Sequence, residues 1–185
     1  MSADEPHLRR IVTGHDAAGN AVVVSDEAVQ PARLDEDSSS AAAFFQVWAT
    51  DRMPVSLSEE ALAAQRSGSA STTVGTGRGT AFRIGVLPPG LRSPMHRTES
   101  IDYAICLEGE CDLELDGGQV VRIHAGDVVI QRGTKHVWHN RSTAPCRFAW
   151  ILIDALPATV AGRQLGTSWE RDDSRSGAAE APDRG

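Results

Sequence analysis

The chain has 185 residues, a length typical of one domain with additional arms and loops. Hydrophobic residues make up 41% of it, enough for a packed core, and the formal net charge is −7. An acidic chain without a basic cluster repels phosphate backbones, which argues against a nucleic-acid partner. No apolar run approaches the roughly 20 residues of a membrane-spanning helix, and residues 1–10 lack the apolar core of a signal peptide. We therefore expect a cytoplasmic protein with no membrane partner.

The first 80 residues predict an arm and a connecting region. Short β-favouring runs at 11–13 and 21–25 flank a segment rich in turn formers, which predicts a β-hairpin arm within residues 1–36. Within 37–80, residues 44–48 predict a strand. Ser56 and Glu59 resemble a helix capping box, so a short helix is expected over 59–65. The Gly-, Ser- and Thr-rich run 67–80 predicts a flexible loop.

Strand patterns are densest over residues 81–156. Cys111, Leu113 and Leu115 alternate with acidic residues, as in a half-buried strand. Turn signals recur at roughly 8–12-residue spacing without a helical segment between them, which predicts an all-β barrel or sandwich. From residue 157 the chain becomes polar, and 157–185 is predicted to be a disordered tail.

Two segments are unusually dense in residues that bind metals or transfer protons, and each also contains two glycines. The first contains Gly90, His96, Asp102 and Gly109, and the second contains Gly126, Gly133, His136 and Asn140. Their spacing resembles the two motifs of the cupin family, with Gln131 where the second motif usually has a proline. The wider pattern His-Arg-Thr-x-Ser-x-Asp-Tyr resembles a subgroup of small single-domain cupins. The resemblance implies an all-β double-stranded β-helix barrel with edge strands that commonly pair between subunits, hence a homodimer.

The resemblance also implies a metal site, and the two-residue period of a strand indicates which side chains share it. His96 and Asp102 are separated by an even number of positions, so in a strand they would lie on the same side. We expect both to face the barrel interior together with His136. Two histidines and one carboxylate can hold a divalent transition metal, and Fe, Mn, Ni and Zn are all compatible. By the same parity, Glu99 and His139 are expected to point away from this site.

The departures from the family pattern leave a second interpretation open. Thr98 stands where the family has a second histidine, and Asp102 is shorter than the usual glutamate. The site would then be a metal-free polar pocket in which His136 or Asp102 acts as the catalytic acid or base. In either case Thr98, Trp138 and Cys106 are expected to line the substrate pocket.

These features predict a small-molecule enzyme, a metal-dependent lyase or oxidoreductase. The expected substrate is an organic acid, a phenol or a polyketide-like carbonyl compound. Decarboxylation, ring-cleaving dioxygenation and isomerisation or dehydration are all compatible with such a site. The alternative is a non-catalytic cupin that binds a small ligand without a metal. A purely structural role fits poorly, because it leaves His96, Asp102 and His136 unexplained as inward polar groups.

Overall fold

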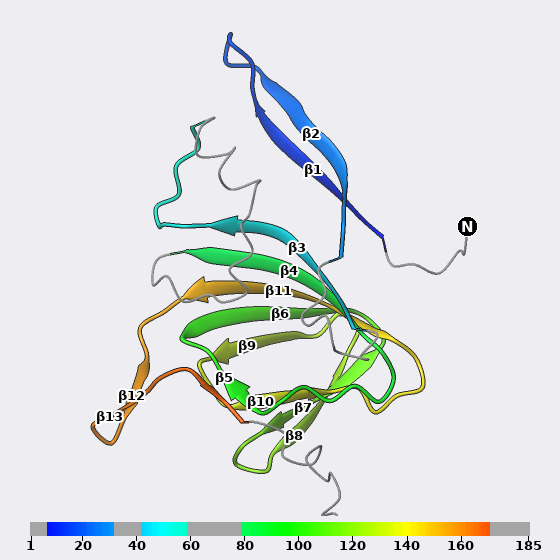
Figure 1. Ribbon diagram of the computed structural model, residues 1–185, viewed down its shortest axis with the longest axis vertical. Helices are drawn as coiled ribbons and strands as arrows, with labels where there is room; N and C mark the ends of the chain where they lie inside the picture. Colours follow the sequence, from blue (N-terminus) through cyan, green and yellow to red (C-terminus); the bar gives the residue numbers. More distant parts are fainter. Residues whose placement is uncertain (1–6, 32–41, 59–78, 171–185) are drawn as a thin grey trace, which may run out of the picture.

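Two five-stranded antiparallel sheets face each other and form a barrel (Figure 1). The structure is a computed structural model, and it describes residues 7–31, 42–58 and 79–170. The first sheet has the order β3-β4-β11-β6-β9 and the second has the order β14-β5-β10-β7-β8. The described residues contain no helix, which confirms the predicted all-β double-stranded β-helix class. The helix expected over 59–65 lies outside the described residues.

The strands of the two sheets have the following bounds. The first sheet contains β3 (Ala43–Thr50), β4 (Thr80–Leu87), β6 (Ser100–Glu108), β9 (Val128–Arg132) and β11 (Cys146–Asp154). The second contains β5 (His96–Arg97), β7 (Glu110–Leu115), β8 (Val120–His124), β10 (His136–His139) and β14 (Ser168–Trp169).

The side chains that point inward from both sheets form one apolar core. It comprises Leu87, Ala104, Cys106, Cys111, Leu113, Ile123, Trp138, Cys146, Phe148 and Trp150. Aromatic rings dominate its centre, where the rings of Phe148 and Trp150 stack with centroids 5.2 Å apart. Gly85 makes room for them, because a Cβ at this position would lie 2.6 Å from the Trp150 ring and 2.8 Å from Phe44. The core therefore marks which face of each strand is the interior.

Strand β7 shows how the alternating pattern positions this face. Cys111 and Leu113 belong to the core, while Asp112 and Glu114 pair with arginines on the outer side. The turn between β7 and β8 contains Gly118 with φ of 83°, a left-handed conformation that glycine adopts without strain. The two-residue period and the turn chemistry together fix the inward face of β7.

The predicted N-terminal β arm is present and longer than the sequence indicated. Strands β1 (Leu8–His15) and β2 (Ala21–Val29) form a separate two-stranded sheet that stands away from the barrel (Figure 1). Its base packs through Leu8 and Val29 on the outer face of the first sheet. Arg10 strengthens this attachment, since it donates to the carbonyl of Val47 at 2.8 Å and lies over the Trp48 ring.

The structure differs from the predicted disordered tail over residues 158–170. Three short strands occur there, β12 (Ala158–Val160), β13 (Arg163–Leu165) and β14, and β14 joins the second sheet beside β5. These strands have only two or three residues each, which is too short for the two-residue hydrophobic period on which strand prediction depends. Residues 171–185 lie outside the described part of the chain.

Within the described residues there is no helix with the length and apolar character needed to cross a bilayer. The homodimer stays a prediction.

Candidate functional site

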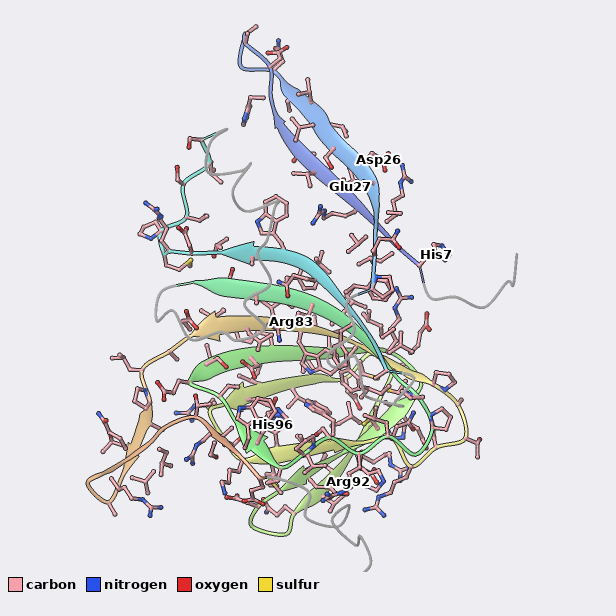
Figure 2. All side chains as sticks on the ribbon, in the orientation of Figure 1. His7, Asp26, Glu27, Arg83, Arg92 and His96 are labelled. Carbon is pink, nitrogen blue, oxygen red and sulfur yellow. The ribbon has the colours of Figure 1, made fainter. Side chains whose placement is uncertain are left out.

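Two histidine rings meet inside the barrel. His96 on β5 and His136 on β10 are direct cross-strand partners, and their ring centroids are 4.2 Å apart. Direct partners in an antiparallel pair point to the same face, and His136 shares its face with the core residue Trp138. Both imidazoles therefore face the interior, as the sequence predicted. Both histidines lie in the second sheet, whereas β4, which carries Arg83, lies in the first; Figure 2 labels His96 and Arg83.

Backbone carbonyls fix the tautomer of both rings. The Nδ1 of His96 lies 2.9 Å from the carbonyl oxygen of Pro94, and the Nδ1 of His136 lies 2.9 Å from that of Thr134. Because a carbonyl oxygen only accepts, each Nδ1 must carry the proton and donate it. In a neutral ring, the Nε2 atom then holds the free lone pair, which is the atom that binds a metal or takes up a proton.

Burial keeps both rings neutral at physiological pH. Desolvation and the neighbouring His96 ring lower the pKa of His136 to about 4, and desolvation also lowers the pKa of His96. The hydrogen bonds to the carbonyls of Thr134 and Pro94 oppose these shifts without cancelling them. A neutral imidazole is the form that coordinates metals, and it is also a proton acceptor.

A polar group on the opposite sheet faces the same interior. Asp102 on β6 is 6% exposed and shares its face with the core residues Ala104 and Cys106. Burial raises the pKa of Asp102, while a hydrogen bond from Ser100 and the positive charge of Arg83 lower it. The Arg83 guanidinium donates through Nε to the side chain of Gln46 at 3.0 Å. Asp102 is thus a buried carboxyl group with one charged neighbour.

The three predicted metal ligands are not gathered into one site. Among residues 7–31, 42–58 and 79–170, no group of three His, Cys, Asp or Glu side chains is close enough to hold an ion. His96 and His136 come together, but Asp102 projects from the facing sheet and is one methylene shorter than the glutamate of the family pattern. The two imidazoles therefore fit two positions of a metal site, and the carboxylate does not supply the third.

The residues expected to line the substrate pocket have different surroundings. The Thr98 hydroxyl lies 2.8 Å from that of Ser100, next to Asp102. Trp138 packs in the core with its ring edge towards His136, at 6.0 Å between centroids. Cys106 is 1% exposed and its thiol contacts Cys146 at 3.8 Å, so it belongs to the core. It lies four residues along β6 from Asp102, about 13 Å in an extended strand, which separates it from the polar group.

The C-terminal segment supplies a site residue that the sequence did not indicate. Trp169 is the cross-strand partner of His96, and the two rings stack with centroids 4.5 Å apart and planes within 6°. Glu99 and Lys135 hold this segment in place: Glu99 Oε1 accepts from the backbone N–H of Thr167 at 3.0 Å, and Lys135 pairs with Glu170 at 2.6 Å. Glu99 thus points away from the histidines but anchors the strand that carries Trp169.

Replacing Trp169 with alanine should expose His96 and raise its pKa towards 6.5, because burial is the main cause of the lowered value. The lost stacking should also cost about 1 kcal/mol of stability. Titration of the ring proton signals by NMR would measure the first effect, and chemical denaturation the second. Trp169→Phe keeps a ring over His96 and should give a smaller shift. An unchanged His96 titration in Trp169→Ala would show that the stacking does not control the environment of this histidine.

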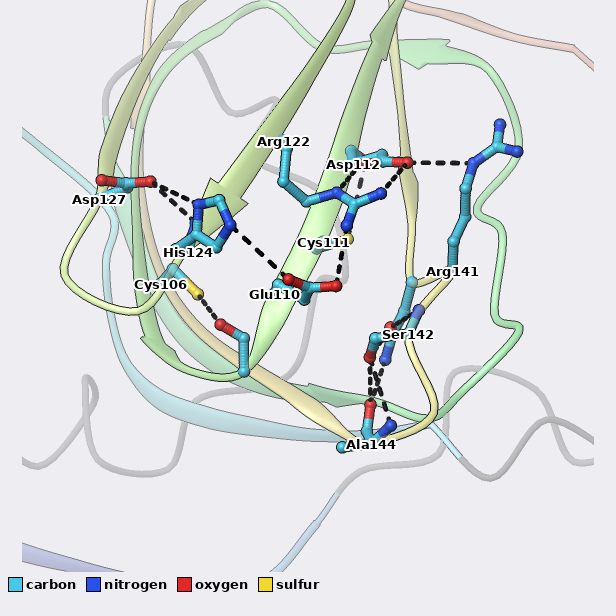
Figure 3. A network of polar contacts seen from close by, with 12 residues as sticks. Cys106, Glu110, Cys111, Asp112, Arg122, His124, Asp127, Arg141, Ser142 and Ala144 are labelled. Carbon is cyan, nitrogen blue, oxygen red and sulfur yellow. Dashed lines mark hydrogen bonds and ion pairs between the residues drawn. The ribbon is translucent and has the colours of Figure 1, made fainter.

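Two other histidines, His124 and His139, lie in a polar network on the outer face of the second sheet. His139 pairs through Nδ1 with Glu114 at 2.9 Å, on the opposite face of β10 from His136. Figure 3 shows His124 between Glu110 and Asp127, beside the Arg122 contacts to Glu110 and Asp112. These side chains pair with one another on the outer face of the second sheet. They therefore take no part in the interior site.

Comparison with known proteins identifies the family. The family model described as "Cupin domain" matches residues 83–152. The chain is 38% identical over 172 residues to "Phomopsin biosynthesis cluster protein C′" of Diaporthe leptostromiformis, covering 90% of each chain. It is 32% identical over 161 residues to the "Cupin-domain-containing oxidoreductase virC" of Hypocrea virens, covering 84% of this chain and 81% of the relative.

A solved cupin-2 domain protein from Rhodospirillum rubrum aligns over 78% of this chain and 76% of its own, with 14% identity and a TM-score of 0.48. The family assignment rests on the sequence relatives, whose similarity covers 84% to 90% of this chain. The protein belongs to the cupin family.

Proposed function

We propose that this protein is a small-molecule enzyme of a biosynthetic pathway, and that His96 and His136 hold a divalent transition metal at its reaction centre. The observation that carries the proposal is the matched arrangement of the two rings. Each donates its Nδ1 proton to a backbone carbonyl, which leaves both Nε2 lone pairs for a common ligand. Such hydrogen bonds to the far nitrogen are typical of histidines that ligate metals.

The relatives support the class of function. One is named as a protein of a phomopsin biosynthesis cluster, and others, including fogC of Aspergillus ruber at 29% identity, are named cupin-domain-containing oxidoreductases. These names favour an enzyme over a passive ligand-binding protein, and among the reactions expected from the sequence they favour oxidation or reduction. The substrate class expected from the sequence, an organic acid, a phenol or a polyketide-like carbonyl compound, suits an interior with both apolar and polar walls.

The second sheet carries the two histidines, and the first sheet carries Asp102. His96 and His136 would hold the metal, and Fe, Mn, Ni and Zn all accept imidazole nitrogen. When bound, such an ion polarises a carbonyl or carboxylate oxygen or activates oxygen. Trp169 and Trp138 restrict the rotation of the two histidine rings. Asp102, on the facing sheet, can orient the substrate and exchange a proton with it.

The lack of a third protein ligand within the described residues supports a second candidate, proton transfer without a metal. In that case the neutral His136, with a pKa of about 4, accepts a proton through Nε2. The rest of the site keeps the same roles, since Asp102 would act on the substrate and the two tryptophans would hold the histidine rings in both mechanisms.

Metal content separates the two candidates. The purified full-length protein would be incubated with Fe²⁺, Mn²⁺, Ni²⁺ or Zn²⁺, desalted and assayed by inductively coupled plasma mass spectrometry. We expect about one ion per chain for at least one of the four metals. Loss of catalytic turnover on chelation, and its return with the same metal, would tie the ion to the reaction. No retained metal under any of these conditions would contradict the metal-dependent mechanism and leave the proton-transfer candidate.

A further inference from the structure

A buried polar pair faces the interior from the first sheet. Asp102 on β6 and Gln131 on β9 are direct cross-strand partners, and they are 6% and 4% exposed. Gln131 shares its face with Val129, which packs on the core, so both side chains point inward. Gln131 occupies the position where the second cupin motif usually has a proline. Both residues therefore give this interior a polar surface on the first sheet.

This pair carries three buried polar atoms whose hydrogen-bonding capacity is not used. Within the described part of the chain, Asp102 Oδ1 and both the Oε1 and Nε2 atoms of Gln131 lack a hydrogen-bond partner. Leaving buried polar groups unpaired costs free energy, so such groups usually mark a bound water or a ligand. Because the unpaired atoms belong to two cross-strand partners, they lie close together and could bind the same ligand.

The surroundings of the pair set the chemistry of a ligand. Leu152, the cross-strand partner of Asp102 on the other side, and Val129 form apolar walls beside it. Arg83 and Asp102 interact electrostatically, so the Asp102 carboxylate already offsets the positive charge of Arg83. A carboxylate ligand would place a second negative charge beside Asp102, which is unfavourable at low dielectric constant. A ligand that fits these surroundings would therefore be an uncharged molecule with an apolar body.

We infer that Asp102 and Gln131 form the substrate-recognition subsite, and that they bind the hydroxyl and the carbonyl oxygen of a neutral hydroxy-carbonyl compound. The hydroxyl donates to Asp102 Oδ1, and the carbonyl oxygen accepts from Gln131 Nε2. The inference rests on the proposed function and narrows its substrate class from organic acids, phenols and carbonyl compounds to neutral hydroxy-carbonyl compounds, since this ligand would be the substrate of the enzyme. Binding is measured without turnover and without metal, so its result is independent of the metal site.

The experiment compares two probes by isothermal titration calorimetry on the metal-free, full-length protein. The first probe, 2-hydroxy-1-phenylethanone, has adjacent hydroxyl and carbonyl groups, and the second, acetophenone, has only the carbonyl. We expect the hydroxyketone to bind about tenfold more tightly, because it makes an additional hydrogen bond to a buried group. In Gln131→Met, affinity for both probes should fall about tenfold through loss of the Nε2 donor. The control Gln119→Met, at an exposed position, should bind both probes as the wild type does.

A charged probe tests the role of Asp102. Mandelate, which has a carboxylate next to its hydroxyl, should bind the wild type more weakly than the hydroxyketone. Asp102→Asn removes the opposing charge and should raise the affinity for mandelate. Equal affinity of the wild type for hydroxyketone and acetophenone, including no binding of either, would overturn the inference. An unchanged affinity for mandelate in Asp102→Asn would also count against it.

Stability distinguishes recognition from a structural role of Gln131. If its amide is held ready for a ligand, Gln131→Met should leave the thermal midpoint of the ligand-free protein unchanged or higher, because an unpaired buried amide is removed. If instead buried water or a protein partner satisfies the amide, the same substitution should lower the midpoint and leave probe affinity unchanged, which would overturn the inference.

Discussion

Replacing His136 with alanine should abolish the retention of a divalent metal while leaving the barrel folded. The site offers two imidazole ligands from the described residues, and removal of one leaves His96 alone, which cannot compete with water for the ion. The fold should persist because the core consists of apolar side chains that contact one another without a metal. Metal content and circular dichroism, measured on the same preparation, would test both parts.

His124→Ala is the matched control for this substitution. The His124 side chain is 61% exposed and contacts Glu110 and Asp127 outside the barrel, so its loss should leave metal content unchanged. Full metal occupancy in His136→Ala would remove His136 from the site. Collapse of the β signal in His136→Ala would instead make the ion a structural one, and the proposed enzyme would lose its main support.

The two-residue period of a strand predicted the inward face of each motif residue but not the distances between them. His96 and His136 have the expected orientation, and the structure adds that their strands are direct neighbours. Asp102 has the expected orientation too, yet it lies on the facing sheet. Alternation along a strand determines which side of the sheet a side chain lies on. The distance between side chains of different strands depends on the strand order of the whole barrel. Alternation therefore predicted the face of all three side chains, but not that Asp102 lies on the facing sheet; the metal site stays a prediction.

The contact between Trp169 and His96 could not be predicted from the sequence. Trp169 lies in a strand of only two residues, which is too short to show a hydrophobic period. The one signal was the tryptophan itself, since a large aromatic side chain often has a packing partner. Glu99 was correctly placed outside the histidine site, but its hydrogen bond to the backbone of Thr167 depends on a tertiary contact between distant segments.

Acidification should destabilise the metal-free protein through His136. In the unfolded chain its pKa is near 6.5, and in the folded protein burial lowers it to about 4. Between these values the unfolded state binds a proton that the folded state does not, so stability falls as the pH falls through this window. A shift of this size corresponds to about 3 kcal/mol, reached near pH 4 and nearly constant below it. Above pH 6.5 neither state holds a proton on His136, and this loss of stability is absent.

Urea denaturation at a series of pH values, with and without His136→Gln, would isolate this contribution. The lowered pKa of His96 acts in the same direction, the raised pKa of Asp102 acts in the opposite one, and the lowered pKa of Glu114 also contributes, so the wild-type curve alone mixes several groups. Glutamine does not titrate, and the difference between the two curves should therefore shrink by about 3 kcal/mol from pH 7 to pH 4. His124→Ala changes an exposed ring and should follow the wild type. Parallel wild-type and His136→Gln curves would mean that His136 is protonated equally in both states, and the neutral ring on which metal binding depends would then exist only above pH 6.5.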